Sequence, residues 1–182
     1  MLSITDLELL KLIQNPSTKE KGFRLLIETY QRRVYGIARK MVLVHEDADD
    51  ITQNTFIKAF KNIHKFQHNS SLFTWLYRIA VNESLTFLES KKKRFFFPVE
   101  DHLEVLENYL DQSAALSADE ITLKLQKALL KIPEKQRLVF NLKYYEDLSY
   151  EEISKITDTS VGALKASYHH AVKKIESILT NE

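Results

Sequence analysis

The stretch from Ser70 to Arg94 constrains the fold most, because a helical pattern runs through it without a glycine or proline. With successive residues about 100° apart, its apolar side chains fall into two arcs. One arc contains Leu72, Trp75, Leu76 and Ile79, and the other contains Phe73, Tyr77, Val81 and Leu88. A helix with two apolar arcs needs neighbours on two sides. The pattern therefore predicts a packed central helix, capped by Ser70 or Ser71.

A polar strip lies between the two arcs, and the stretch ends in a basic cluster. The strip consists of Thr74, Arg78, Asn82 and Glu89, and the cluster of Lys91, Lys92, Lys93 and Arg94. One interpretation is a rigid surface that binds a polyanion. The other is a core helix whose solvated end carries cations because they stabilise the negative end of the helix dipole. The stretch alone leaves both interpretations open.

The composition favours an all-α protein. Among 182 residues there are only three Gly and three Pro, and 44% are hydrophobic, which is enough for one ordinary domain or two small ones. The absence of Cys excludes disulfides and thiolate sites. No Gly-rich phosphate loop, nucleophile elbow or His–Glu metal spacing occurs, so we expect no catalytic residue, metal or cofactor. Without a signal-peptide pattern or an apolar run of about 20 residues, we expect a cytoplasmic protein that does not insert into membranes.

The charge is unevenly distributed along the chain, although its net value is only +1. Residues 1–94 carry 16 Lys and Arg against 10 Asp and Glu, and residues 95–118 carry none against 5. Residues 119–182 carry 10 of each. An acidic middle therefore masks a basic N-terminal half, and the distribution is compatible with nucleic-acid binding.

Three further helices are expected in the N-terminal half. The first spans Ser3–Gln14 and stops at Asn15-Pro16, and the second follows Ser17 and Thr18. The third begins with four acids, which the positive end of the helix dipole favours: Glu46, Asp47, Asp49 and Asp50. These acids could instead form a metal cluster with His45, but adjacent helical carboxylates point in different directions. A third interpretation is a docking face for a partner, made by Asp50, Gln53 and Asn54.

The C-terminal part carries clear helix caps. A capping box at Ser117 begins a helix that ends before Pro133, and Pro133 suits the first turn of the next helix. A second capping box, Ser149 to Glu152, begins a helix of about two turns, and Ser160 caps the last helix. A short capped helix, a tight turn and a longer helix predict a helix-turn-helix over residues 149–173.

The outer face of the last helix combines small and basic side chains. Its members are Gly162, Lys165, Ala166, His169 and Lys173, with His170 at the edge. Small residues let such a helix enter the major groove, while Lys and His reach bases or phosphates. An ordinary helical hairpin with a solvated face is the alternative.

Four motifs in this order resemble one protein family. They are Glu46–Phe56, Phe73–Asn82, Ile132–Arg137 and Leu148–Ile153. Together they resemble the extracytoplasmic-function (ECF, group 4) sigma factors of bacterial RNA polymerase, in the sigma-70 family. The resemblance implies two small helical domains, residues 1–94 (region 2) and 117–182 (region 4), joined by an acidic linker at residues 95–116.

The resemblance also implies a role for each surface. The residues that would bind the clamp coiled coil of the polymerase β′ subunit are Asp47, Asp50, Gln53 and Asn54. Those that would bind and help open the promoter minus-10 element are Phe66, Ser71, Trp75, Arg78, Asn82, Lys91 and Lys92. Those that would read the minus-35 element are Ser160, Gly162, Lys165, Ala166, His169, His170 and Lys173. Further implied partners are the polymerase β flap and an anti-sigma factor, and catalysis would remain with the polymerase.

The chain departs from the family pattern at a few positions. Asn54 stands where the family often has Glu, and Ser167, His170 and Val172 stand where arginines are common. Fewer arginines imply a weaker grip on phosphate. Two other function classes also fit parts of the pattern. One is a free-standing helix-turn-helix repressor or activator, which would bind duplex DNA alone, and the other is a helical adaptor with no DNA dependence.

Overall fold

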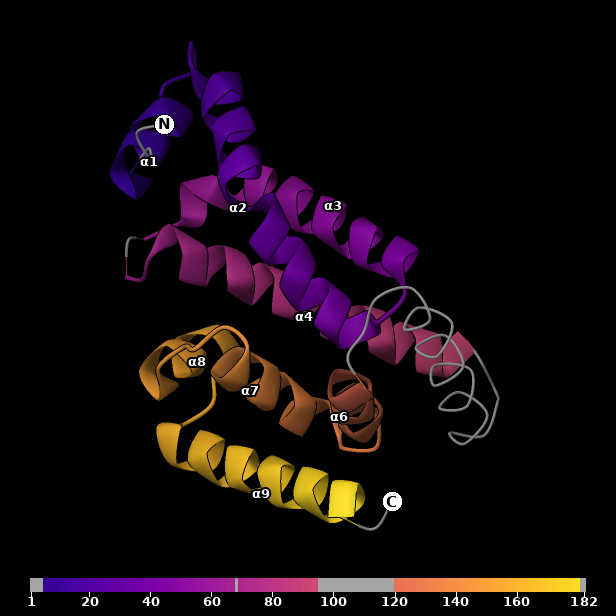
Figure 1. The fold of residues 1–182 in the computed structure, drawn as a ribbon. Helices are drawn as coiled ribbons and strands as arrows, with labels where there is room; N and C mark the ends of the chain where they lie inside the picture. The colour runs from indigo at the N-terminus through magenta and orange to yellow at the C-terminus, as the bar shows by residue number, and fades with distance from the viewer. Residues whose placement is uncertain (1–4, 68, 95–119, 181–182) are drawn as a thin grey trace. The chain divides into compact units, whose positions relative to one another are not determined.

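The computed structural model describes residues 5–67, 69–94 and 120–180, which form eight α-helices and one short 3-10 helix, without a strand (Figure 1). The predicted all-α fold is confirmed. Contacts within the chain separate it into two units, Met1–Phe87 and Leu88–Glu182. The linker predicted at residues 95–116 and the capping box at Ser117 lie outside the described residues. The domain limits at residues 94 and 117 therefore stay predictions.

The first unit is built from α1, α2, α3, a 3-10 helix and most of α4 (Figure 1). Their bounds are Asp6–Gln14 for α1, Lys19–Val42 for α2, His45–Asn62 for α3, Ile63–Lys65 for the 3-10 helix η1, and Leu72–Arg94 for α4. The first helix begins later than the predicted Ser3, because Thr5 caps it. The Thr5 hydroxyl accepts from the N–H of Glu8 at 3.3 Å, and the Glu8 carboxylate accepts from the N–H of Thr5 at 2.8 Å.

Helices α1 and α2 approach closely at Gly22. A Cβ added there would lie 2.8 Å from Cγ1 and 2.9 Å from the backbone nitrogen of Ile13 in α1. The Thr18 hydroxyl also donates to the carbonyl of Leu12 at 2.8 Å, which fixes the turn between the helices. Glycine is therefore required at residue 22 because any side chain would overlap the facing backbone.

We expect Gly22→Ala to lower the free energy of unfolding by about 1–3 kcal/mol, because the two helices must separate to admit a methyl group. Gly36→Ala in the same helix is the matched control, since an added Cβ there meets nothing within 4 Å. Relief of the glycine penalty should stabilise that variant by about 0.5–1 kcal/mol. Urea unfolding followed by circular dichroism measures both. Equal effects of the two substitutions would contradict the close approach.

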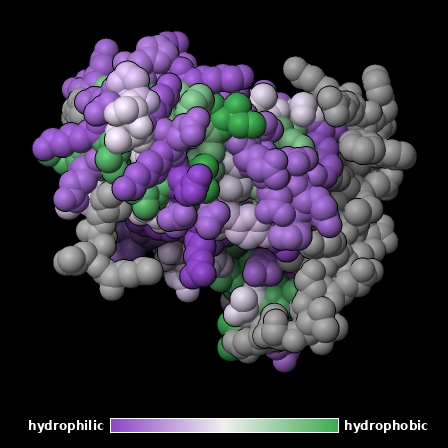
Figure 2. Space-filling view, turned by 90° about the horizontal axis from the view of Figure 1, so that it is seen from above, coloured by the Kyte–Doolittle hydropathy of each residue, from purple (hydrophilic) through white to green (hydrophobic). Residues whose placement is uncertain are grey.

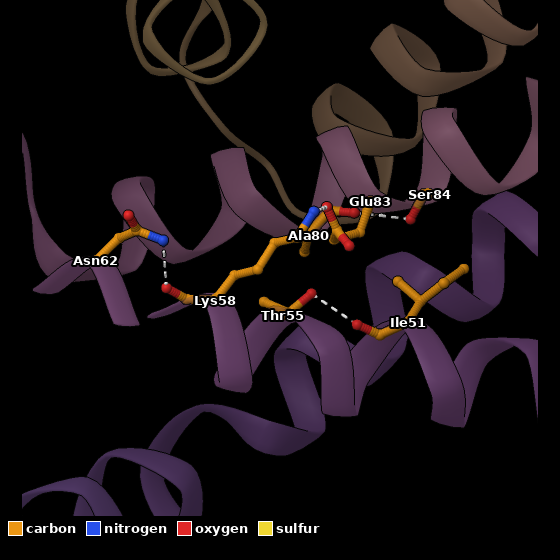
Figure 3. Close-up of polar contacts among 7 residues, drawn as sticks. All are labelled: Ile51, Thr55, Lys58, Asn62, Ala80, Glu83 and Ser84. Atoms are coloured by element: carbon orange, nitrogen blue, oxygen red, sulfur yellow. Dashed lines mark hydrogen bonds and ion pairs between the residues drawn. The ribbon is translucent and has the colours of Figure 1, made fainter. Parts of the chain in front are cut away.

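Helices α3 and α4 contact each other, and both bury small side chains (Figure 3). Ala48, Thr55 and Ala59 of α3 and Ala80 and Ser84 of α4 are all fully buried. The two hydroxyl groups are satisfied within their own helices, Thr55 by the carbonyl of Ile51 and Ser84 by that of Ala80, both at 2.8 Å (Figure 3). At the edge of this contact, Lys58 forms an ion pair with Glu83 (Figure 3). Small residues at buried positions allow helices to pack closely.

The second unit contains α6 (Glu120–Leu130), α7 (Glu134–Tyr144), α8 (Tyr150–Thr157) and α9 (Val161–Thr180), with the last residues of α4 assigned to it. Its core joins α6, α7 and α9 through Ala128, Leu129, Ile132, Phe140, Ala171 and Ile175. The apolar pattern of α7 predicts that Leu138, Val139, Leu142 and Tyr145 face inward. The first three are buried, but Tyr145 is not, because its ring is 36% exposed at the end of α7.

Candidate functional site

One outward face of α3 carries the residues predicted to bind the polymerase. The opposite side of the helix is buried through Ala48, Ile51 and Thr55, so Asp50, Gln53 and Asn54 are left exposed within one turn. Asp47, one turn earlier, is half-buried. The structure thus brings the four predicted residues onto neighbouring positions of one helix.

Sequence reasoning missed an apolar residue on this face. Ile57 is 50% exposed and follows Gln53 by one helical turn. Its spacing from Gln53 and Asn54 was the available signal, because residues three and four apart share a face. Phe60, 43% exposed, lies one turn beyond Ile57, with its ring edge-on to Phe23 at 4.6 Å.

Exposed apolar side chains are the exception on the surface drawn in Figure 2, where hydrophilic residues predominate and hydrophobic ones form small patches. Isolated exposed apolar residues need no explanation. Ile57 is of interest because three exposed polar residues of α3 share its face.

A second face is formed by the first four turns of α4. Ser71, Arg78 and Asn82 are exposed, and they follow one another at spacings that keep them on one side of the helix. Trp75 lies between them, half-buried, with its ring 5.6 Å from that of Phe66 in the preceding segment. Five of the seven residues predicted for minus-10 DNA are therefore adjacent. Lys91 is half-buried near the end of α4, and the side chain of Lys92 lies outside what the structure describes.

The polar strip differs from the prediction at Thr74, which is only 5% exposed. Of the two predicted caps, Ser70 and Ser71, it is Ser71 that caps the helix, and this cap draws Thr74 inward. The Ser71 hydroxyl accepts from the N–H of Thr74 at 3.0 Å and lies 2.8 Å from the Thr74 hydroxyl. The strip begins instead with Ser71 and continues through Arg78, Asn82 and Glu89, which are all exposed.

Helices α8 and α9 form the predicted helix-turn-helix. The Ser149 capping box is present, with Ser149 Oγ accepting from the N–H of Glu152 at 3.2 Å. Asp158 ends α8 in the left-handed region, with φ 55° and its N–H donating to the carbonyl of Ser154 at 2.9 Å. After this three-residue turn, Ser160 caps α9 by accepting from the N–H of Ala163 at 3.3 Å.

The outer face of α9 is open along its length. All of the residues predicted to read minus-35 DNA are exposed: Ser160, Gly162, Lys165, Ala166, His169, His170 and Lys173. The inner side is held by Leu164, Ala171 and Ile175, which are buried. No atom lies within 4 Å of a Cβ added to Gly162, so the start of the helix offers room to another molecule. Ala163 is also exposed on this face and was not predicted.

We expect Ser149→Ala to destabilise the second unit by about 1 kcal/mol at neutral pH, because α8 loses its cap. Hydrogen bonds from the hydroxyl and N–H of Ser149 lower the pKa of Glu152 in the folded protein. A lowered pKa contributes stability above the unfolded value and loses it as the pH falls. The difference in the free energy of unfolding between wild type and Ser149→Ala should therefore shrink below about pH 4. Urea unfolding at pH 7 and pH 3.5 measures it, and a constant difference would contradict the account.

In the part of the chain that the structure describes, no group of three or more His, Cys, Asp or Glu is arranged to hold a metal ion. His45 instead lies 2.7 Å from the hydroxyl of Tyr35 and 3.4 Å from the carboxylate of Asp49. None of the helices in the described ranges could span a membrane.

Comparison with known proteins connects both faces and the helix-turn-helix to one family. The family description Sigma-70 region 2 matches residues 26–94, and Sigma-70, region 4 matches residues 122–175. The ECF RNA polymerase sigma factor SigW of Bacillus subtilis is 32% identical over 159 residues, covering 82% of this chain and 84% of that protein. The ECF RNA polymerase sigma-E factor of Haemophilus influenzae is 33% identical over 184 residues, covering 96% and 95%.

Solved structures share the fold. The sigma factor RpoE from Bartonella quintana, crystallised with the anti-sigma factor NepR, aligns with a TM-score of 0.65 and 21% identity over 88% of this chain and 98% of that one. CnrH, solved in complex with the cytosolic domain of CnrY, aligns with a TM-score of 0.69 and 22% identity over 97% and 98%. Both likenesses concern the fold alone.

Proposed function

Because the chain belongs to the ECF sigma factors of bacterial RNA polymerase, we propose that it directs core polymerase to specific promoters and helps to open the minus-10 element. The observation that carries the proposal is the order of its surfaces. A polar face on α3 and a polar strip on α4 lie in the region 2 match, and an open recognition helix lies in the region 4 match.

The α3 face would bind the clamp coiled coil of the polymerase β′ subunit. Asp50, Gln53 and Asn54 supply hydrogen-bonding groups, and Ile57 supplies apolar area beside them. A mixed surface of this kind suits an interface that needs both specificity and burial. Asn54 replaces the acid common in the family, so its contact would be a neutral hydrogen bond. Asp47, being half-buried, would act at the edge of this contact.

The α4 strip would bind the opened minus-10 strand. The aromatic rings of Phe66 and Trp75 lie together beside the exposed Ser71. An unstacked base can bind such a surface by stacking on a ring and by hydrogen bonding. Arg78 and Asn82 continue the strip along the helix, where they would contact the next bases or phosphates. The basic end of α4, with Lys91 and Lys92, would add attraction to the phosphate backbone.

The α9 face would enter the major groove of the minus-35 element. Gly162 and Ala166 allow a close approach, while Lys165, His169 and Lys173 can reach bases and phosphates. Because this face has few arginines, its own affinity for phosphate should be low. Binding to the minus-35 element would then depend on the other contacts of the complex, made by region 2 and the polymerase. We also propose that region 4 binds the polymerase β flap.

In this proposal, the polymerase carries out catalysis, and this chain binds the polymerase and the promoter and helps to separate the DNA strands. A cytoplasmic location follows, because the polymerase and the chromosome are there. An anti-sigma factor is a further proposed partner. Its support is the fold shared with the sigma factor RpoE, solved in complex with the anti-sigma factor NepR, and with CnrH, solved in complex with the cytosolic domain of CnrY.

Run-off transcription with purified core polymerase tests the function. A library of randomised promoters is transcribed with and without the chain, and the selected promoters are sequenced. We expect transcription that requires the added chain and a recurrent pair of elements upstream of the start. A free-standing repressor would instead bind duplex DNA tightly without core polymerase. Transcription that does not depend on the chain would reject the proposal.

A further inference from the structure

The start of α4 is held from outside by a residue of α1. The Asp6 carboxylate accepts a hydrogen bond from the N–H of Leu72 through Oδ2, at 3.1 Å, and another from the hydroxyl of Tyr30 through Oδ1. One side chain thus joins α1, α2 and α4. The two bonded residues, Leu72 and Tyr30, are 1% and 8% exposed.

This contact suits the physical chemistry of a helix terminus. The first N–H groups of a helix have no partner within the helix, and the dipole favours a negative charge near them. At the start of α4, the Asp6 carboxylate accepts from the N–H of Leu72, and the Ser71 hydroxyl accepts from the N–H of Thr74. Burial and the hydrogen bond to Asp6 both raise the pKa of Tyr30, so its hydroxyl stays protonated and remains a donor.

The residue that Asp6 holds is next to the surface proposed to capture a base. Ser71 directly precedes Leu72, and its carbonyl accepts from the N–H of Trp75 at 3.1 Å. Trp75 in turn contacts Phe66 at the other end of the loop. Asp6 lies in the first turn of α1, directly after the cap residue Thr5.

We propose that Asp6 is a positioning residue for minus-10 base capture, acting by fixing the start of α4 that carries Ser71 and Trp75. This inference rests on the proposed function and assigns part of that function to α1. Residues 26–94 match region 2, so α1 lies outside the matched part.

The test measures how strongly one base is recognised. Holoenzyme made from core polymerase and the full chain binds single-stranded oligonucleotides of the minus-10 element selected by run-off transcription, either intact or lacking one base at a time. Removal of the captured base should weaken wild-type binding about tenfold, the size of one lost stacking contact. In the Asp6→Ala variant, removal of the same base should weaken binding only about twofold, because the start of α4 is no longer fixed. Affinity for core polymerase should stay within about twofold of wild type.

Two variants separate positioning from folding. Asp6→Asn keeps an oxygen facing Leu72, so its discrimination should lie between those of wild type and Asp6→Ala. Glu8→Ala breaks the α1 capping box but leaves the Asp6 carboxylate, so it reports the cost of weakening α1 alone. Its discrimination should stay close to that of wild type. Because discrimination is a ratio of two affinities, it is insensitive to a reduced fraction of folded protein.

The outcomes are distinct. Wild-type discrimination in Asp6→Ala, or an equal loss in Glu8→Ala, would overturn the positioning role while leaving the proposed function intact. Wild-type holoenzyme that binds none of the oligonucleotides would reject minus-10 recognition by the proposed function itself.

Discussion

The double substitution Asp50→Ala with Gln53→Ala is expected to weaken binding to core polymerase about 100-fold, since each side chain occupies the middle of the proposed interface. Both are exposed on α3, so the melting temperature should change by less than about 2 °C. Fluorescence titration of labelled chain with core polymerase measures the affinity, and calorimetry measures the melting temperature.

The chain offers a matched control for this pair. Glu28 and Gln31 of α2 are also an acid and a glutamine three residues apart, and both are exposed. Glu28→Ala with Gln31→Ala removes the same chemistry from another surface and should leave the affinity within about twofold. A large loss of stability in the Asp50 and Gln53 variant would show instead that the α3 residues support the fold.

Arg78→Ala with Asn82→Ala should reduce the rate of promoter opening about 100-fold, with unchanged affinity for core polymerase. Each lost contact to a base or phosphate is worth roughly 1–3 kcal/mol. The two residues are exposed one turn apart on α4, a different helix from the one that carries the proposed polymerase-binding face. Stopped-flow fluorescence of a base analogue placed in the minus-10 element measures the rate.

Arg24→Ala controls for the loss of one positive charge, because Arg24 is exposed on α2 and has no proposed contact with DNA. It should open promoters at nearly the wild-type rate. Single substitutions then separate the roles of the two strip residues. If Asn82→Ala alone leaves the opening rate unchanged, Asn82 is not part of the DNA surface.

Local signals made much of this structure predictable from the sequence. At Ser71, Ser149 and Ser160, the cap hydroxyl accepts a hydrogen bond from the N–H group three residues later, so both partners lie close together in the sequence. The three- and four-residue spacing of Ala48, Ile51, Thr55 and Ala59 along α3 likewise determines which face is buried and which is left for a partner. The polar residues of that face, and those of α9, could therefore be named in advance.

What the sequence could not show depends on distant contacts. Asp6 and Leu72 are 66 positions apart, and a helix periodicity carries no information about such a pair. Thr74 appeared polar by spacing, but the Ser71 cap turns it inward. Gly22 lies inside a helix where glycine is unfavourable, and only the facing backbone of Ile13 explains it.

Photo-crosslinking tests the central claim most directly, namely that two separate helical surfaces contact an opened strand and an upstream duplex. A photoreactive amino acid replaces Asn82 in one preparation and His169 in another, and each holoenzyme is irradiated on a selected promoter. The account predicts attachment from residue 82 to the unpaired minus-10 strand and from residue 169 to the minus-35 duplex, in both cases only with core polymerase present. Attachment of both residues to the same segment, or equal attachment without core polymerase, would contradict it.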